Sequence, residues 1–262
     1  MKLGVIGLGK MGTALIKGVL QAEIYSPTEI IASDINKKNI PEIEVIQDNI
    51  TCSKRAKTLI LAIKPQVMDE VLAEIKDEVK DKLVISIAAG ISIAHLKDKL
   101  PSSTRIIRVM PNAPAVINQG ISAYACGPAV LEQDKELVAN LFSGIGEVFE
   151  VKENLMNAIT GLSGSGPAFI YTILEAISDG GVAAGLARED AIKLTALTMR
   201  GAASMVLETG EHPGQLKDMV TSPGGTAITG IEVMERNGMR GIMMETIKKA
   251  VLKSQELDQA IN

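Results

Sequence analysis

The sequence predicts an α/β protein in two parts, a doubly wound parallel sheet over residues 1–151 and an all-helical domain over residues 152–262. In the first part, short runs that are apolar throughout alternate with amphipathic stretches, which is typical of parallel strands covered by helices on both faces. In the second part, apolar residues recur at helical spacing and no strand-like run remains. A length of 262 residues is sufficient for two ordinary domains.

The chain opens on a strand, a glycine turn and a helix. The apolar run Lys2–Ile6 leads into Gly7-Leu8-Gly9-Lys10-Met11-Gly12, and the amphipathic stretch Thr13–Gln21 follows at once. This order is the beginning of a Rossmann-type dinucleotide-binding unit. The first glycine permits the tight turn, the second lets the backbone approach a pyrophosphate, and the third lets the helix pack on the strand. A glycine turn in a buried hairpin is the alternative, and the strand–turn–helix context favours the cofactor site.

A second strand, Glu29–Ser33, ends at Asp34, which lies 22 residues after the last glycine of that motif. An acidic side chain at this point accepts hydrogen bonds from an adenosine ribose. A helix cap or a turn is the alternative role of such an aspartate. Ser33, Lys37 and Lys38 are candidates for holding a 2′-phosphate instead. The sequence favours a ribose contact and leaves the choice between NADP(H) and NAD(H) open.

The remaining apolar runs of the first part complete the predicted sheet. Small, turn-forming residues collect after them, at the carboxyl ends where ligands bind in such sheets. Lys64 stands at one of these ends, and it either faces the cofactor or is a solvated loop lysine. The predicted strands are Glu44–Gln47, Thr58–Ala62, Leu83–Ile87, Arg105–Met110, Ile121–Ala125 and Glu147–Glu150, with helices at Gln66–Val79, Ser92–Leu100 and Ala129–Phe142.

Helical periodicity dominates the second part. Small residues such as Gly180, Gly181 and Gly201 lie on these helices and permit close helix approach. So much small and apolar helix surface favours burial against a second subunit, and packing on the sheet domain is the alternative. The predicted helices are Glu153–Thr160, Pro167–Ala184, Arg188–Thr209, Pro213–Val220, Gly224–Arg236 and Met239–Ile261.

Two polar, glycine-rich segments interrupt these helices, at Gly161–Pro167 and at Ser222–Thr226. Hydroxyl groups and glycines before a helix offer backbone N–H groups and side-chain donors to an anion. Ordinary N-capping explains a single serine or threonine, whereas consecutive glycines favour a site for a carboxylate.

Composition limits the partners and the compartment. A net charge of −4, with no basic cluster among aromatic residues, argues against nucleic acid. No apolar run is long enough for a membrane span, and charged and glycine residues interrupt the N-terminal run before it resembles a signal peptide. Cys52 and Cys126 show neither metal spacing nor a disulfide framework, which favours inert thiols in a reducing cytoplasm. His95 and His212 lack partners at catalytic or metal spacing, so both are predicted to be structural and no metal is expected.

The predicted chemistry is hydride transfer from a nicotinamide. Reduction of a ketone creates an alkoxide that needs an acid nearby, usually lysine, histidine or tyrosine. Reduction of a protonated imine gives a neutral amine and needs no strong acid. Residues 161–172, where a helical domain would meet the nicotinamide, contain no His, Lys or Arg, and the next lysine is Lys193. This favours an imine over the nearest rival, a 3-hydroxyacid dehydrogenase of similar build.

Several motifs together resemble those of the pyrroline-5-carboxylate reductase family. The resemblance spans the whole chain in the right order. It implies NAD(P)H-dependent reduction of 1-pyrroline-5-carboxylate to L-proline, the last step of proline synthesis. It also implies a homodimer interlocked through the helical domains, with further assembly into a decamer. The matching segments are Thr160–Phe169, Asp179–Val182, His212–Asp218, Ser222–Thr226, Ala62–Pro65 and Ile87–Gly90.

Carried over position by position, the resemblance implies a cofactor site and a substrate site. The substrate would meet Ser222, Gly224, Gly225 and Thr226, together with Glu153 and Glu211, and Thr226 is the candidate catalytic residue. The implied cofactor residues are Ile6, Gly7, Leu8, Gly9, Lys10, Met11, Gly12, Ser33, Asp34, Asn49, Ala62, Ile63, Lys64, Pro65, Ala88 and Ala89.

The chain departs from the family pattern at two positions. Family members often have Ser, Thr or Asn-Arg where this chain has Asp34, which puts a strict preference for NADPH in doubt. Many also have a second hydroxyl residue where this chain has Ala227, so Thr226 or a water would contact the imine nitrogen. The opposing hypothesis is a non-catalytic dinucleotide-binding regulator, and Ala227 is the feature that supports it.

Overall fold

The computed structural model describes residues 1–36 and 38–261. Its internal contacts define two compact units. The first consists of Met1–Ser165 together with the C-terminal stretch from Lys249, and the second of Gly166–Lys248. The sequence places a domain boundary at residue 151, where the last strand ends, and that boundary stays a prediction.

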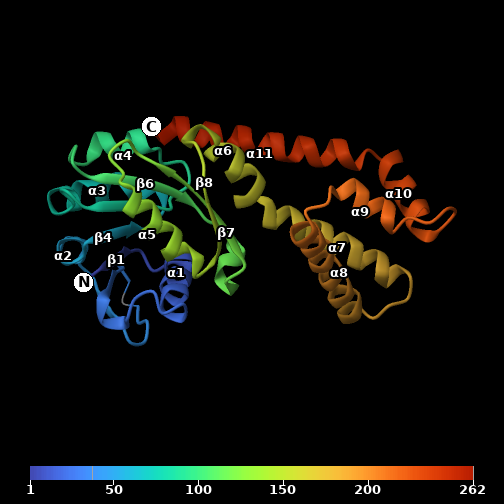
Figure 1. Ribbon diagram of the computed structural model, residues 1–262, viewed down its shortest axis with the longest axis horizontal. Coiled ribbons are helices and arrows are strands. Elements are labelled where there is room, and N and C mark those ends of the chain that lie inside the picture. The colour runs from blue at the N-terminus through green and yellow to red at the C-terminus, as the bar shows by residue number, and fades with distance from the viewer. Residues whose placement is uncertain (37, 262) are drawn as a thin grey trace. The chain divides into compact units, whose positions relative to one another are not determined.

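The first unit contains one eight-stranded sheet in the order β3-β2-β1-β4-β5-β6-β7-β8. Strands β1, β4, β6, β7 and β8 are labelled in Figure 1. The predicted fold class is confirmed, and strands β1 to β6 are parallel as expected. The strands are β1 Leu3–Ile6, β2 Ile30–Ser33, β3 Glu44–Ile46, β4 Thr58–Leu61, β5 Leu83–Ser86, β6 Arg105–Met110, β7 Gly120–Cys126 and β8 Gly146–Glu150.

The prediction of an all-parallel sheet is wrong for β7, which runs antiparallel to β6. A parallel neighbour requires a crossover of a dozen or more residues, usually a helix. Only a short segment with the 3₁₀ turn Ala113–Ile117 joins β6 to β7, so the chain reverses direction instead. The helix between β7 and β8 restores a parallel pairing for the last strand.

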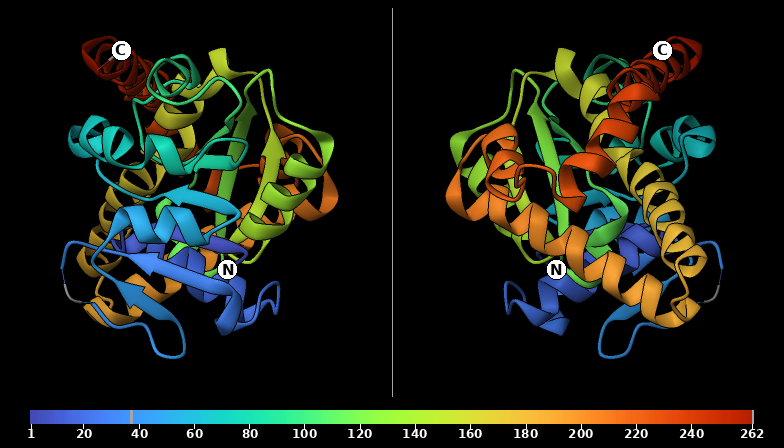
Figure 2. Two further views of the ribbon diagram at one scale, coloured as in Figure 1. Left: turned by 90° about the vertical axis from the view of Figure 1, so that its left-hand side faces the viewer. Right: turned by 90° about the vertical axis from the view of Figure 1, so that its right-hand side faces the viewer.

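Helices cover both faces of the sheet (Figure 2). One apolar cluster joins the strands to α1 and α5, and the other joins them to α2, α3 and α4. The sequence does not predict α2, a seven-residue helix that the Asp48 side chain caps through the N–H of Thr51. The helices of this unit are α1 Lys10–Gln21, α2 Asn49–Arg55, α3 Met68–Ile75, α4 Ile93–Lys99, α5 Glu132–Ser143 and α6 Met156–Ile159.

The described residues beyond 151 contain helices and no strand, so the predicted helical second part is confirmed. Helix α10 begins at Thr226, two residues later than predicted. Gly224 has a positive φ of 65°, which is not a helical conformation, and Gly225 is the N-cap. The remaining helices are α7 Gly166–Ala183, α8 Arg188–Thr209, α9 Pro213–Met219, α10 Thr226–Arg236 and α11 Met239–Ile261.

Candidate cofactor and substrate sites

A cavity of about 780 Å³ lies in the first unit, over the carboxyl ends of β2, β1 and β4. This volume is typical of a small-molecule or cofactor site. Nine of the predicted cofactor residues line it: Ile6, Gly7, Gly9, Ser33, Asp34, Asn49, Ala62, Ile63 and Lys64. The other predicted residues do not form the cavity wall. Leu8, Lys10, Met11, Gly12 and Pro65 lie close to lining residues in sequence, whereas Ala88 and Ala89 lie in the loop between β5 and α4.

The three motif glycines have different roles. Gly7 has a φ of 98°, and a Cβ there would lie 2.5 Å from the carbonyl oxygen of Ala62. A Cβ at Gly12 would lie 2.2 Å from the carbonyl oxygen of Gly7, so the turn itself excludes a side chain at both positions. A Cβ at Gly9 would meet no atom within 4 Å. The open space at Gly9 therefore faces the cavity, where a pyrophosphate would approach the backbone.

Gly9 is also the N-cap of α1. The first N–H groups of a helix have no intrahelical acceptor, and together with the helix dipole they favour an anion. The turn, the open glycine and the cavity volume fit the diphosphate of a nicotinamide dinucleotide.

The Asp34 carboxylate closes the glycine turn. It accepts hydrogen bonds from the N–H of Leu8 at 2.7 Å and of Asn36 at 2.9 Å, and Lys38 Nζ lies 3.5 Å away. Burial favours a raised pKa for Asp34, but the two backbone N–H groups and the Lys38 charge outweigh it and hold the pKa below its usual value. Lys38 also donates to the carbonyl oxygen of Leu8. Lys37, the other candidate for a 2′-phosphate, lies outside the described residues.

A hydrogen-bonded chain crosses the adenosine side of the cavity. Ser33 Oγ donates to Asn49 Oδ1 at 2.7 Å, and Asn49 Nδ2 donates to Glu74 Oε2 at 2.8 Å. The sequence interpretation missed Glu70 and Glu74, which also line the cavity. Their spacing of four residues on the helix that follows Lys64 was the signal that could have found them.

The Ser222–Thr226 segment forms one turn before α10 in the second unit. The N–H of Gly225 donates to the carbonyl oxygen of Ser222 at 3.1 Å, and a Cβ at Gly225 would lie 2.3 Å from Ser222 Oγ. Gly225 must therefore remain small for the serine hydroxyl to lie over the helix start. Thr226 is the first residue of α10 and is exposed. Glu211, in the same unit, is exposed after the end of α8.

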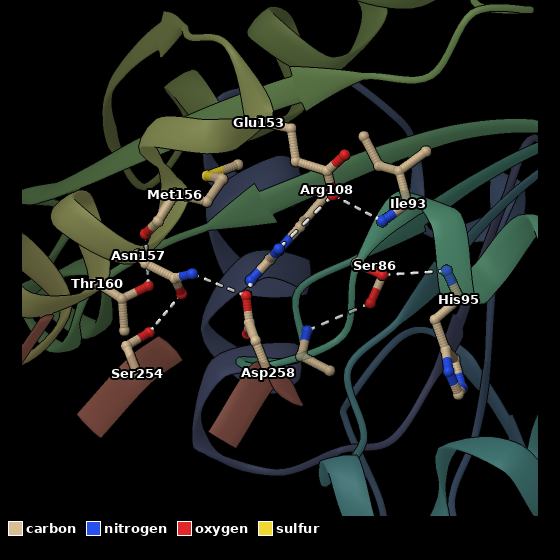
Figure 3. A network of polar contacts seen from close by, with 12 residues as sticks. Ser86, Ile93, His95, Arg108, Glu153, Met156, Asn157, Thr160, Ser254 and Asp258 are labelled. Carbon is tan, nitrogen blue, oxygen red and sulfur yellow. Dashed lines mark hydrogen bonds and ion pairs between the residues drawn. The ribbon is translucent and has the colours of Figure 1, made fainter. Parts of the chain in front are cut away.

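Glu153, the remaining predicted substrate residue, contacts a helix start and an arginine. Its Oε1 accepts a hydrogen bond from the N–H of Ile93 at 2.7 Å and lies 3.6 Å from Arg108 Nη1 (Figure 3). These contacts lie in the first unit, whereas the Ser222–Thr226 turn belongs to the second.

Most of the Gly161–Pro167 segment is helical, so its prediction as a loop is wrong. A π-helix, Thr160–Gly164, joins α6 to α7, and the N–H of Ser165 donates to the carbonyl oxygen of Thr160. The glycines here serve close packing. A Cβ at Gly161 would lie 2.6 Å from Val251 Cγ2, and a Cβ at Gly164 would lie 2.6 Å from Met110 Cε.

The histidines and cysteines make local contacts. His95 Nε2 lies 2.6 Å from Asp69 Oδ1, and His212 Nδ1 accepts the N–H of Gly214 at the start of α9. Burial raises the pKa of the Cys52 thiol to about 12 and that of Cys126 to about 11. Both cysteines are free thiols, and they are protonated at neutral pH.

A doubly wound sheet with an open motif glycine at a helix start defines an oxidoreductase of the nicotinamide dinucleotide class. The family comparisons agree. Residues 2–90 match the family described as NADP oxidoreductase, coenzyme F420-dependent, and residues 153–257 match pyrroline-5-carboxylate reductase dimerisation.

Individual relatives cover the whole chain. It is 44% identical to the pyrroline-5-carboxylate reductase of Methanosarcina acetivorans, over 98% of this chain and 97% of that one. It is 40% identical to that of Glycine max, over 97% and 95%. The Plasmodium falciparum pyrroline carboxylate reductase with NADP bound superposes with a TM-score of 0.92, at 33% identity and 98% coverage of both chains. The chain belongs to the pyrroline-5-carboxylate reductase family.

Proposed function

We propose that this chain reduces the C=N bond of 1-pyrroline-5-carboxylate, with NAD(P)H as reductant, to give L-proline. When bound, the nicotinamide would supply a hydride to the imine carbon, and the electron pair of the C=N bond would go to the protonated ring nitrogen. A neutral amine results, so no side chain must neutralise an alkoxide. Residues 161–172 contain no His, Lys or Arg, and Tyr171 is the one residue there of a type that usually serves as the acid. The observation that carries the proposal is the open Gly9 in the cavity wall, within a chain related over its whole length to reductases of this substrate.

The turn before α10 supports a site for the substrate carboxylate. The first N–H groups of α10 have no intrahelical acceptor, and Ser222 adds a hydroxyl next to them. Gly224, where an added Cβ would meet nothing within 4 Å, leaves room for the carboxylate to approach the backbone, whereas Gly225 makes room for the Ser222 hydroxyl. Thr226 carries the first side-chain hydroxyl of the helix and is assigned to the ring nitrogen, with Ala227 unable to replace it. Glu211, exposed after the end of α8, is the remaining residue of the second unit that we assign to the substrate.

The chain is proposed to act as a homodimer, with a decamer as the larger assembly. The support comes from the helical unit, which belongs to the dimerisation family and leaves many large apolar side chains exposed. Cβ atoms added at Gly180, Gly201, Gly230 or Gly241 would meet nothing within 4 Å, so these helix faces are open to close approach.

The compartment is proposed to be the cytoplasm, without nucleic-acid partners. Two free thiols suit a reducing compartment, and a net charge of −4 disfavours binding to nucleic acid. As a separate finding, no helix among the described residues is long and apolar enough to cross a membrane.

A steady-state assay tests the proposed function. Purified protein should oxidise NADPH or NADH only when 1-pyrroline-5-carboxylate is added, and L-proline should accumulate in equal amount. A protein that binds the cofactor but shows no turnover with this substrate would instead be the non-catalytic regulator, for which Ala227 is the supporting feature.

A further inference from the structure

A buried arginine joins three distant parts of the first unit. Arg108 lies on β6 with its side chain 5% exposed, and it faces two carboxylates. Glu153, which follows β8, lies 3.6 Å from Arg108 Nη1, and Asp258 of α11 lies 3.4 Å from Nη2 (Figure 3). A buried cation is tolerated only when it is paired, so the two carboxylates are needed to hold this guanidinium in place.

The Asp258 side of this cluster continues into the helices. Asn157 Nδ2 donates to Asp258 Oδ2 at 2.9 Å, and Ser254 Oγ donates to Asn157 Oδ1 at 2.7 Å. These contacts fasten the end of α11 to α6 (Figure 3). Arg108 is therefore held on one side by Asp258 of α11, which is bonded to α6, and Glu153 links it to the other side.

The Glu153 side leads to the loop between β5 and α4. Glu153 Oε1 accepts the N–H of Ile93, the first residue of α4, at 2.7 Å. This bond satisfies one of the N–H groups that a helix start leaves without an acceptor. The loop that ends there contains Ala88 and Ala89, which the family resemblance assigns to the cofactor, and Gly90 with a φ of 79°. The N–H of Ala88 donates to Ser86 Oγ at 3.4 Å, and Ser92 Oγ caps α4 by accepting the N–H of His95 at 3.0 Å.

The order of the strands places this loop next to the cofactor cavity. The cavity lies over the ends of β2, β1 and β4, and β5 is the next strand in the sheet. A dinucleotide that continues along this edge of the sheet reaches the end of β5. The position of α4 then determines whether the β5–α4 loop can contact the cofactor.

We propose that Glu153 is a positioning residue for the cofactor and does not bind the substrate. Its carboxylate connects the fixed Arg108 to the first turn of α4 and so holds the 87–91 loop in the form that receives the nicotinamide half. This inference rests on the cofactor site proposed above. It replaces the substrate role that the family resemblance implies for Glu153.

The test compares two substitutions of Glu153 with a control on the same segment. Glu153→Ala removes both the hydrogen bond to Ile93 and the charge beside Arg108, whereas Glu153→Gln keeps an acceptor for the Ile93 N–H. Glu150→Gln makes the same chemical change at an exposed strand end, where the carboxylate pairs with Lys135. Three quantities are measured for each: the NADPH dissociation constant without substrate, the KM for 1-pyrroline-5-carboxylate at saturating NADPH, and amide hydrogen exchange at Ile93.

For Glu153→Ala we expect the NADPH dissociation constant to rise about tenfold, since losing a charge-assisted bond leaves the loop competent only a fraction of the time. The KM for the substrate should stay within about twofold, and exchange at Ile93 should accelerate. Glu153→Gln should recover most of the NADPH affinity, to within about threefold of the wild type. Glu150→Gln should match the wild type in all three quantities.

The opposite pattern of effects on the NADPH dissociation constant and on the KM would overturn the inference. An unchanged NADPH dissociation constant together with a raised KM for the substrate would make Glu153 a substrate residue. Unchanged values of both would leave Glu153 with no role in either site. If Glu153→Ala does not fold, Glu153→Gln decides the matter, because a raised KM for the substrate with an unchanged NADPH dissociation constant would make Glu153 a substrate residue. A wild type that fails to bind NADPH would contradict the cofactor site itself, so the two failures are distinguishable.

Discussion

The two units bury their apolar side chains to very different extents. In the first unit, two apolar clusters fill both faces of the sheet, with Leu15, Ile60 and Phe142 fully buried. In residues 166–248, all of which the structure describes, only Ser178, Ala191 and Thr195 are buried. The first unit has a core of its own, whereas the helices of the second expose apolar side chains such as Leu207 and Met244. Large exposed apolar surfaces mark interaction sites, so this difference supports the proposed homodimer.

The largest expected effect is the loss of the proposed dimer. Leu207 is 84% exposed in the single chain, and Leu207→Glu would place a charge in each half of a twofold interface. If each lost leucine costs about 2 kcal/mol, the dissociation constant of the dimer rises roughly a thousandfold. Sedimentation velocity measures the dissociation constant of the dimer.

Ile35→Glu is the matched control for this prediction. Ile35 is also 84% exposed but belongs to the first unit, so its substitution should leave the assembly unchanged. A wild-type chain that sediments as a monomer at micromolar concentration would show that the exposed helix faces have no partner subunit.

The next effect concerns the first unit and its glycines. Gly9→Val should weaken NADPH binding roughly a hundredfold, equivalent to about 2.7 kcal/mol, because the side chain would fill the space open to the pyrophosphate. The fold should persist, since no protein atom lies within 4 Å of the added Cβ. Gly12→Ala, by contrast, should destabilise the fold and lower the melting temperature, because its Cβ would lie 2.2 Å from the carbonyl oxygen of Gly7. Equal NADPH affinity in wild type and Gly9→Val would reduce the motif to a structural turn.

A smaller effect is expected at the turn before α10. Thr226→Ala should lower turnover about tenfold if the hydroxyl contributes about 1.4 kcal/mol in the transition state. Ser222→Ala should chiefly raise the KM, because its contact to the carboxylate is made equally in ground and transition states. Thr229→Ala is the control, since its hydroxyl only donates to the carbonyl oxygen of Gly225. Wild-type turnover and KM in Thr226→Ala would place the contact to the ring nitrogen elsewhere.

The smallest effect is expected at the two thiols. Burial raises the pKa of Cys52 to about 12 and that of Cys126 to about 11, so neither thiol ionises appreciably at pH 8. Iodoacetamide should therefore modify the native protein far more slowly than the unfolded one. Mass spectrometry of the alkylated protein measures this, and rapid modification of Cys52 at pH 8 would mean that the sheet unit opens readily.

The comparison of units also separates what a sequence can predict from what it cannot. Continuous apolar runs locate the strands because burial on both faces leaves a local signal. They do not give the direction of β7, which depends on the short connection from β6. Helix α2 escapes notice because seven residues with few apolar side chains form no clear period.

The sites show the same limit. The motif at Gly7–Gly12 is local, and nine predicted residues line one cavity. The partners of Glu153 are 60 residues away for Ile93 and 45 for Arg108, and no spacing reveals them. The Gly161–Gly166 run resembles a loop in composition, yet Gly161 and Gly164 make room for Val251 and Met110, which only the tertiary structure brings near.

Transfer of the hydride itself is the most direct test of the account. Wild-type protein is supplied with 1-pyrroline-5-carboxylate and NADPH carrying two deuterium atoms at C4, and the proline formed is analysed by mass spectrometry. We expect L-proline heavier by one deuterium, bound at the former imine carbon, because one C4 hydrogen moves as a hydride. Proline without deuterium, or bound NADPH without proline, would contradict it.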